Sequence, residues 1–527
     1  MRFQWSDRQI DRAWYGGLWL AAIALFTVNL GGVALRDWDE GLVAQVAREI
    51  AQSSSSTWLF PTLWGQPYLN KPPLVHGLIA VAYRWGGITE WSARLPGALL
   101  TALSVPLLYA VGREVFHRRS AAVFAALIYL TSLPVVRNGR LAMLDGAVLC
   151  FLLLMMLGTV RSRRDYRYTL LIGLSFGAIC LSKGVMVGIL LGAIVLLFLA
   201  WDTPRLLKLP YLWLGLGLGA VPVGLWYGAQ WLHYGQLFVG NNLVDQSLQR
   251  IWTDVENHGG APWFYLVELL KYGVPWILFL PLGVRLAWQN RPLSWAKLAI
   301  VWSGLYLVAI SLMSTKLPWY SLPLYPPLAL LTGAAVAELW QQGQHIGVKQ
   351  FPAPQYARIW PGLFALIAVA GWAGFVYFGW WSVPVQADVQ LVLGAIGLTM
   401  TAVAILLAQG DSQFLPVLIW GTYVALLLFV ASSHWVWELA EAYPVKPVAA
   451  LTQQVPAHSP LYTSYPYHRP SLNFYSDRPI LPADAKQLKR LWRREPQPYL
   501  LVDAPTLAGL KSPDILGTAE GWTLVTK

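Results

Sequence analysis

Four charged residues, Arg36, Asp37, Asp39 and Glu40, directly follow an apolar run long enough to cross a bilayer, which takes about 20 residues. At a membrane surface, Asp39 and Glu40 could accept a proton from an attacking hydroxyl, as a general base does. Charges also mark the ends of membrane spans, and we interpret Arg36 and Asp37 as such boundary charges. Asp39 could instead cap an amphipathic helix expected over residues 40–52, although capping and catalysis do not exclude each other.

Further charged residues flank the later apolar segments. The stretches that hold them are NKPPL, RNGRLAMLD, LSKG, LQRIWTDVENHGG and KLPWYSLPLYPP, with Lys71, Arg137, Arg140, Asp145, Lys183, Arg250, His258, Lys316 and Tyr320 as candidate site residues. Asp145 stands out because it lies inside an apolar run. A carboxylate there costs about 2.5–3.5 kcal/mol on insertion scales and usually faces a polar cavity.

Each of these residues also has a plain structural explanation when it is taken alone. The three lysines could extend along the lipid toward its phosphates, the arginines could be bilayer-edge charges, and His258 could be a loop histidine. Together, carboxylates and several cations at one membrane face suit transfer from an anionic lipid phosphate. A carboxylate would take the proton of the acceptor, and Lys and Arg would neutralise the departing phosphate.

The composition is that of a polytopic membrane protein. Of the 527 residues, 56% are hydrophobic and only 12% are charged, whereas soluble proteins carry about 25% charged residues. The apolar blocks predict about thirteen spans, with the first retained as an anchor. The net charge of +12 falls mainly in short loops, which indicates positive-inside orientation rather than nucleic-acid binding. Cys150 and Cys180 lie in apolar segments and suggest neither disulfides nor a metal pair.

The basic loops define a cytoplasmic side, and the carboxylates near span ends lie on the opposite side. The elements that must position the site are therefore the membrane helices and the outer loop 36–91. We predict a membrane domain over residues 1–442 and a small extracytoplasmic α/β domain over 443–527. In that tail, SPLYTSYP, LNFYSDRPI, PYLLVDA and GWTLVTK predict strands, and residues 485–495 predict a basic helix. GLGLGA at 215–220 indicates helix packing rather than dinucleotide binding.

The motifs and their order resemble one family. Asp-Glu after the first span, KPPL, SARLPGAL, the pair Arg140 and Asp145, LSKG and KLPWYSLPLYPPLAL are similar to the polyprenyl-phosphate-dependent glycosyltransferases of the GT-C superfamily. Within it, the chain looks most like the ArnT-type aminoarabinose transferases, which are related to protein mannosyltransferases. The resemblance implies an all-α polytopic membrane domain with about thirteen helices and juxtamembrane helices, plus the small extracytoplasmic α/β domain.

The resemblance also implies an activity and site roles. It implies sugar transfer, as a hexosyl- or pentosyltransferase, from undecaprenyl phosphate to an extracytoplasmic lipid, glycan or protein acceptor, with inversion, at the inner membrane. Asp39 would be the leading catalytic carboxylate, with Asp145 second and Glu40 beside them. Lys71 would grip the lipid phosphate. The other binding candidates are Arg137, Arg140, Lys183, Arg250, Lys316 and Tyr320.

One position departs from the family pattern. Relatives often carry Glu before the KPP lysine, where it can join a loop histidine at a metal, but this chain has Asn70. A neutral amide is a poor zinc ligand, so His258 is a weak metal candidate, and no cofactor beyond a possible divalent cation is implied. Two other classes remain open, a transporter or flippase for an anionic lipid and an assembly factor that binds partners through its tail.

Overall fold

The computed structural model describes residues 6–53, 56–254, 258–344, 359–436 and 444–527. The chain divides into two compact units, and each is described by itself. We call the first the membrane unit (Met1–Leu30, Leu69–Val75 and Leu95–Trp435) and the second the sheet unit (Gly31–Tyr68, His76–Arg94 and Val436–Lys527). The predicted domain boundary at residues 442/443 lies outside the described residues.

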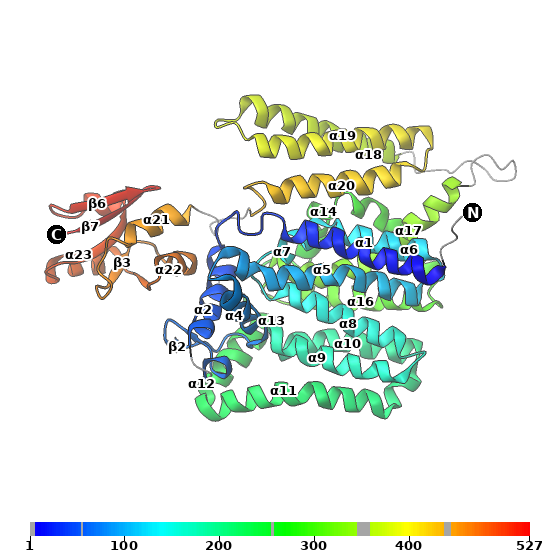
Figure 1. The fold of residues 1–527 in the computed structure, drawn as a ribbon, viewed down its shortest axis with the longest axis horizontal. Helices are drawn as coiled ribbons and strands as arrows, with labels where there is room; N and C mark the ends of the chain where they lie inside the picture. Colours follow the sequence, from blue (N-terminus) through cyan, green and yellow to red (C-terminus); the bar gives the residue numbers. More distant parts are fainter. Residues whose placement is uncertain (1–5, 54–55, 255–257, 345–358, 437–443) are drawn as a thin grey trace. The chain divides into compact units, whose positions relative to one another are not determined.

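The membrane unit is a helical bundle, drawn from blue to yellow in Figure 1. Its longer helices are α1 (Asp7–Thr27), α5 (Glu90–Val115), α6 (Arg119–Leu130), α8 (Asp145–Arg161), α9 (Thr169–Lys183), α10 (Val185–Asp202), α11 (Pro210–Tyr234), α15 (Leu280–Gln289), α16 (Ser294–Leu312), α17 (Tyr325–Gln344), α18 (Ile359–Val376), α19 (Ala387–Gln409) and α20 (Phe414–Ala431). Its shorter helices are α7 (Leu133–Gly139), α12 (Gln236–Phe238), η4 (Val239–Leu248), α13 (Gln249–Trp252), α14 (Phe264–Tyr272) and η6 (Pro318–Leu324).

Within the described residues, eight helices are long and apolar enough to cross a membrane, or ten spans if each of two bent helix pairs counts as one. A multi-pass membrane protein with a mostly helical membrane domain is thereby confirmed, but the predicted count of thirteen spans is not. Two helices predicted as spans that are not among the eight are α8, with 17 residues, and α9, with 15. At about 1.5 Å per residue both are shorter than the roughly 30 Å hydrocarbon layer.

Glycines bring α9 and α11 into backbone contact. A Cβ atom added at Gly219 would overlap the carbonyl group of Gly173, and one added at Gly173 would overlap Gly215. Gly215 and Gly219 are four residues apart and therefore share one face of α11. Small residues at this spacing let membrane helices approach closely, so the packing role predicted for GLGLGA is confirmed.

We expect Gly219→Leu to destabilise the protein, because the new side chain would force α9 and α11 apart. The cost of such overpacking is typically about 1–3 kcal/mol, which a lower melting temperature in detergent would report. Gly217→Leu is the matched control, since Gly217 lies on the same helix with nothing within 4 Å of an added Cβ. Equal melting temperatures for the two variants would contradict the packing argument.

The sheet unit begins with short elements of the first loop. They are η1 (Asp37–Gly41), α2 (Leu42–Gln52), α3 (Ser56–Leu59), β1 (Thr62–Leu63), β2 (Gln66–Pro67) and α4 (Leu74–Gly86), whose first residues belong to the membrane unit. The helix predicted over 40–52 is confirmed as the end of η1 followed by α2. Val43, Val46 and Ile50 are buried, as suits the apolar face of an amphipathic helix, and the polar side chain of Gln45 is buried too.

The C-terminal part of this unit holds a five-stranded sheet in the order β4-β3-β5-β7-β6. The strands are β3 (Leu461–Thr463), β4 (Ile480–Pro482), β5 (Tyr499–Asp503), β6 (Asp514–Ala519) and β7 (Trp522–Thr526), and the helices are α21 (Val445–Thr452), α22 (Pro470–Ser476), α23 (Ala485–Arg494) and α24 (Ala504–Ala508). β3 pairs in parallel with β4 and β5, whereas β7 is antiparallel to β5 and β6. Figure 1 shows these elements in orange and red.

The predicted small α/β domain is thus present, with one wrong element. Residues 472–480 were expected as one strand, but α22 occupies most of them and only Ile480 begins β4. Pro470 explains the difference, because its fixed φ favours the first turn of a helix. Strand β5 is apolar throughout its middle because both of its faces are covered. Leu501 packs into one hydrophobic cluster, and Leu500 and Val502 pack into another on the other face.

Candidate active site

The predicted site residues fall into two groups. Asp39 and Glu40 belong to the sheet unit, and the others belong to the membrane unit. Several of the predicted site residues of the membrane unit lie at helix ends, and we call them the membrane group. These ends are the start of α8, the end of α9, the segment η4–α13 and the start of η6. These termini contact one another within the membrane unit, as the following bonds show.

Asp145 and Lys183 form the centre of the membrane group. Asp145 is the first residue of α8 and Lys183 the last helical residue of α9. The Lys183 ammonium group forms an ion pair with Asp145 Oδ1, and their side chains are 15% and 7% exposed. A buried carboxylate at a helix start, matched by a buried cation at a helix end, is favoured by both helix dipoles. Asp145 therefore faces a polar site, as its position in an apolar run predicted.

Tyr320 joins this pair to Arg250. The Lys183 Nζ atom lies 5.3 Å from the centre of the Tyr320 ring, and Arg250 Nη1 donates to the Tyr320 hydroxyl at 3.3 Å. The Tyr306 hydroxyl donates to the backbone oxygen of Tyr320 at 3.0 Å and fixes the start of η6. Lys183 and Arg250 thus approach one half-buried tyrosine from two elements. Two cations held in this way form a suitable binding site for an anionic group.

The KPP segment is fastened to the same part of the membrane unit. Asn242, a buried residue of η4, donates from Nδ2 to the backbone oxygens of Leu69 at 2.8 Å and Asn70 at 3.3 Å. This holds the backbone just before Lys71, whose side chain is partly exposed. Asn242 could not be singled out before the structure was known, because an amide in a π-helix has no characteristic motif.

Lys316 differs from the other predicted lysines in where its ammonium group lies and what it binds. Its ammonium group is buried and donates to the backbone oxygens of Ile310, Ser311 and Met313, which lie in the last turn and at the C-cap of α16. Burial lowers the pKa of Lys316. Its backbone N–H donates to the backbone oxygen of His258 at 2.7 Å. This arrangement supports a role in shaping the loop, and a phosphate contact for Lys316 stays a prediction.

Arg140 is completely buried and ties α1 to the bundle. Its Nη1 and Nη2 atoms donate to the backbone oxygens of Leu25 at 2.7 Å and Val28 at 2.6 Å. Its guanidinium group lies 4.4 Å from the centre of the Trp435 ring. Arg137, in the last turn of α7, is also buried. Neither is the bilayer-edge charge that was the alternative interpretation, and their substrate contacts stay predictions.

In the sheet unit, the charged side chains of residues 36–40 form a buried network around one partly exposed carboxylate. Arg94 binds Glu40 in a bidentate ion pair, with two nitrogen–oxygen distances of 2.7 Å, and both side chains are fully buried. Arg36 pairs with Asp39 at 3.0 Å, and the Asp39 side chain keeps 20% exposure. Among these carboxylates Asp39 is the one that solvent or substrate can reach.

Two interpretations of this stretch are wrong. Arg36 and Asp37 are not boundary charges, because both are buried and Asp37 pairs with Arg469. Asp39 does not cap the following helix, since the N-cap position of α2 is Gly41 and no side chain caps it. Arg94 and Arg469 were not predicted as part of the site, although SARLPGAL and the stretch before LNFYSDRPI contain them and could have drawn attention to them.

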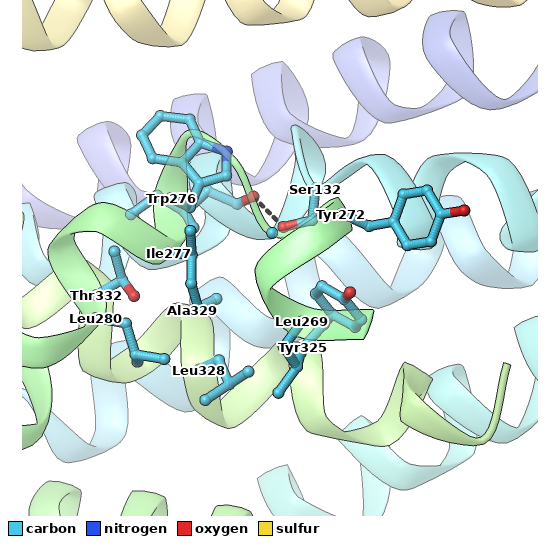
Figure 2. Close-up of a pocket in the computed structure, with 12 residues that line it drawn as sticks. Ser132, Leu269, Tyr272, Trp276, Ile277, Leu280, Tyr325, Leu328, Ala329 and Thr332 are labelled. Carbon is cyan, nitrogen blue, oxygen red and sulfur yellow. Dashed lines mark hydrogen bonds between the residues drawn. The ribbon is translucent and has the colours of Figure 1, made fainter. Parts of the chain in front are cut away.

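Two cavities in the membrane unit are separate from these residues. A pocket of about 30 Å³ between α6, α14, α17 and the turn at Trp276 is apolar and too small for a sugar (Figure 2). A larger cavity of about 810 Å³ among α1, α6, α17 and α20 is lined mostly by apolar side chains, with Arg119, Ser120 and Thr131 among the polar ones. Within the described part of the chain, none of the predicted site residues lines either cavity.

The structure offers no constellation for a metal among the residues it describes, which contain no group of three or more His, Cys, Asp or Glu side chains able to hold an ion. His258 is exposed, and its neighbours 255–257 lie outside the described residues. A divalent cation at His258 therefore stays a prediction, and no step below depends on one.

Comparisons with known proteins agree with this architecture. A family model described as dolichyl-phosphate-mannose-protein mannosyltransferase matches residues 70–227. The chain is 30% identical over 358 residues to an undecaprenyl phosphate-alpha-4-amino-4-deoxy-L-arabinose arabinosyl transferase of Pseudomonas fluorescens, covering 64% of this chain and 62% of that protein. A relative from Aeromonas salmonicida with the same function in its name is 28% identical, with 63% and 60% covered. The chain thus spans about three fifths of these relatives.

Two solved structures share the fold. The crystal structure of ArnT from Cupriavidus metallidurans bound to undecaprenyl phosphate matches with a TM-score of 0.75 and 20% identity, covering 98% of both chains. The archaeal oligosaccharyltransferase AglB from Archaeoglobus fulgidus matches with a TM-score of 0.53 and 11% identity, covering 95% of this chain and 70% of that one.

The chain shares the fold of ArnT and, more distantly, that of AglB. Its sequence is similar to the undecaprenyl phosphate-aminoarabinose transferases of Pseudomonas fluorescens and Aeromonas salmonicida. The resemblance stated from the motifs is therefore confirmed.

Proposed function

We propose that the protein is an integral-membrane glycosyltransferase that moves a sugar from a polyprenyl phosphate, such as undecaprenyl phosphate, to an extracytoplasmic acceptor with inversion. The single observation that carries this proposal is the convergence of Lys183, Arg250 and Tyr320 beside Asp145 at the ends of membrane helices. Cations fixed at helix ends suit a lipid phosphate. The names of the sequence relatives support a transferase over a flippase.

The reaction follows from the charges. The acceptor hydroxyl attacks the anomeric carbon, the bond from that carbon to the phosphate oxygen breaks, and polyprenyl phosphate leaves with the electron pair. We assign Asp39 as the general base that takes the hydroxyl proton, because it is the accessible carboxylate of its network. Lys71, Lys183 and Arg250 stabilise the negative charge that grows on the phosphate. Glu40, locked by Arg94, holds the loop instead of reacting.

We place the reaction on the extracytoplasmic face of the inner membrane. The opposite ends of the same membrane helices carry a belt of arginines, including Arg113, Arg119, Arg161 and Arg163. Basic residues of this kind mark the cytoplasmic side, so Asp145 and Lys183, at the other ends of α8 and α9, lie on the outer side. The acceptor class is a lipid, glycan or protein, and Asn70 argues against copying the relatives' own acceptor.

The deciding experiment uses the purified full chain in proteoliposomes. It would be incubated with polyprenyl phosphates that carry radiolabelled pentoses or hexoses, together with membrane extract as a source of acceptors. We expect label to pass to one acceptor fraction with release of polyprenyl phosphate. If labelled carrier instead crosses sealed vesicles intact, with no sugar transferred, the protein is a flippase and the proposal fails.

Lys71→Ala is expected to cut kcat/KM for the donor by about 10²–10³-fold, the usual loss for one electrostatic group in an active site. Most of the loss should appear as a higher donor KM if Lys71 grips the phosphate already in the ground state. Lys208→Ala is the control, because Lys208 is an exposed lysine of a loop on the other side. Equal kinetics in the two variants would remove Lys71 from the site.

A further inference from the structure

Asp37 is held entirely by residues from the far end of the chain. Arg469 Nε lies 2.6 Å from Asp37 Oδ2, and the two side chains are only 7% and 1% exposed. Ser471 donates to Asp37 Oδ1 from its backbone N–H at 3.0 Å and from its hydroxyl at 2.7 Å. Both carboxylate oxygens of Asp37 are therefore engaged by α22 and the residue before it.

The same segment presses on the end of η1. A Cβ atom added at Gly41 would lie 2.7 Å from Ser471 N and 2.9 Å from the carbonyl carbon of Pro470. These distances leave room for hydrogen alone, so glycine is required by the close approach of two backbones. Asp37 and Gly41 are the first and last residues of η1, which means that residues 469–471 hold this helix at both ends.

The helix that is held in this way has an unusual backbone. Gly41 N donates to Arg36 O at 2.9 Å, a bond over five residues that widens the turn. Single π-turns are uncommon and need support from their surroundings, and they often occur at functional sites. Here the widened turn places Asp39 between Asp37, bound by Arg469, and Glu40, bound by Arg94.

We propose that Arg469 and Ser471 are positioning residues for Asp39. By holding Asp37 and Gly41 in place, they keep η1 in its π-helical turn. In that turn the Asp39 carboxylate is accessible to substrate. This inference deepens the proposed function and rests on Asp39 being the base. It makes the C-terminal sheet domain a structural part of the catalytic loop, in place of a separate module for partner binding.

The kinetic test compares Arg469→Ala with Arg490→Ala in the full chain. Arg490 lies exposed on α23 of the same domain and is the matched control. We expect Arg469→Ala to lower kcat at least tenfold while the donor KM stays within about twofold, because the donor phosphate is held elsewhere. Arg469→Lys should restore part of kcat by keeping the charge. If Arg469→Ala and Arg490→Ala have the same kcat, the proposal is overturned.

A second readout does not depend on activity. Cys150 and Cys180 are both buried, so a spin label can be attached selectively at Trp38→Cys, an exposed position within η1. The label should be immobile alone or with Arg490→Ala, and mobile with Arg469→Ala, each measured at a temperature at which circular dichroism shows the variant to be folded. An equally immobile label with Arg469→Ala overturns the clamp. If the wild-type chain shows no transfer activity, the proposed function fails. The mobility of the label would still decide whether residue 469 orders η1.

Discussion

Asp39→Asn is expected to abolish transfer while leaving the fold intact. Asparagine has nearly the same shape, and its side-chain oxygen can still accept the hydrogen bond from Arg36 that the structure shows at 3.0 Å. It cannot accept the acceptor's proton, and loss of a general base lowers kcat by about 10²–10⁴-fold. Because Asp39 acts on the acceptor hydroxyl, the donor KM should change little. The measurement is steady-state transfer with a labelled donor, with the melting temperature recorded in parallel.

The control for this variant is Asp245→Asn. Asp245 is an exposed carboxylate of η4, so loss of its charge tests whether any acidic residue near the membrane surface would have the same effect. Transfer should stay at the wild-type rate. Retention of more than a tenth of kcat in Asp39→Asn would assign the base to another residue, with Asp145 the next candidate.

The second large effect concerns the ion pair between Asp145 and Lys183. Removing one partner leaves a buried charge without its counter-ion, which costs about 3–5 kcal/mol, whereas removing both can cost much less. We therefore expect Lys183→Ala to lower the melting temperature more than the double variant Asp145→Asn/Lys183→Ala does. Transfer should be lost in both, because each lacks the cation that faces Tyr320.

The bundle provides a matched control at the opposite ends of its helices. Asp202 and Lys297 form an ion pair at 3.3 Å with side chains 6% and 15% exposed, nearly the burial of Asp145 and Lys183. Lys297→Ala should lower the melting temperature less than Lys183→Ala, because Asp202 keeps Arg163 at 3.5 Å, and it should preserve transfer once the protein is folded. If Lys183→Ala at a permissive temperature transfers as fast as Lys297→Ala, the cluster at Lys183 is structural only.

Much of this organisation could be predicted from sequence, because the strongest signals are local. The basic helix predicted over residues 485–495 is present as α23, and the structure adds a capping box of Asp484 and Gln487 at its start. Asp145 could be singled out because an acid inside an apolar run is costly. The membrane class and the packing role of Gly215 and Gly219 followed from composition and spacing in the same way.

The partners of the charged stretch could not be predicted. Asp37, Asp39 and Glu40 are three acids in one short stretch, yet Asp37 and Glu40 are bound by Arg469 and Arg94 and only Asp39 stays partly exposed. Which acid is buried depends on residues far along the chain, and a single sequence does not show pairings over such distances. Lys183 and Lys316 differ for the same reason, because one meets a carboxylate and the other meets backbone oxygens.

The clamp on η1 also has a consequence for biosynthesis. Asp37 and Arg469 are 432 residues apart, and a ribosome adds about 5–20 residues per second, so roughly 20–90 s separate the synthesis of the two. During that interval the loop at residues 36–41 has been made, but the residues that hold η1 have not. If the proposed function holds, we expect the nascent chain to gain transfer activity only after α22 has been made and has docked on Asp37.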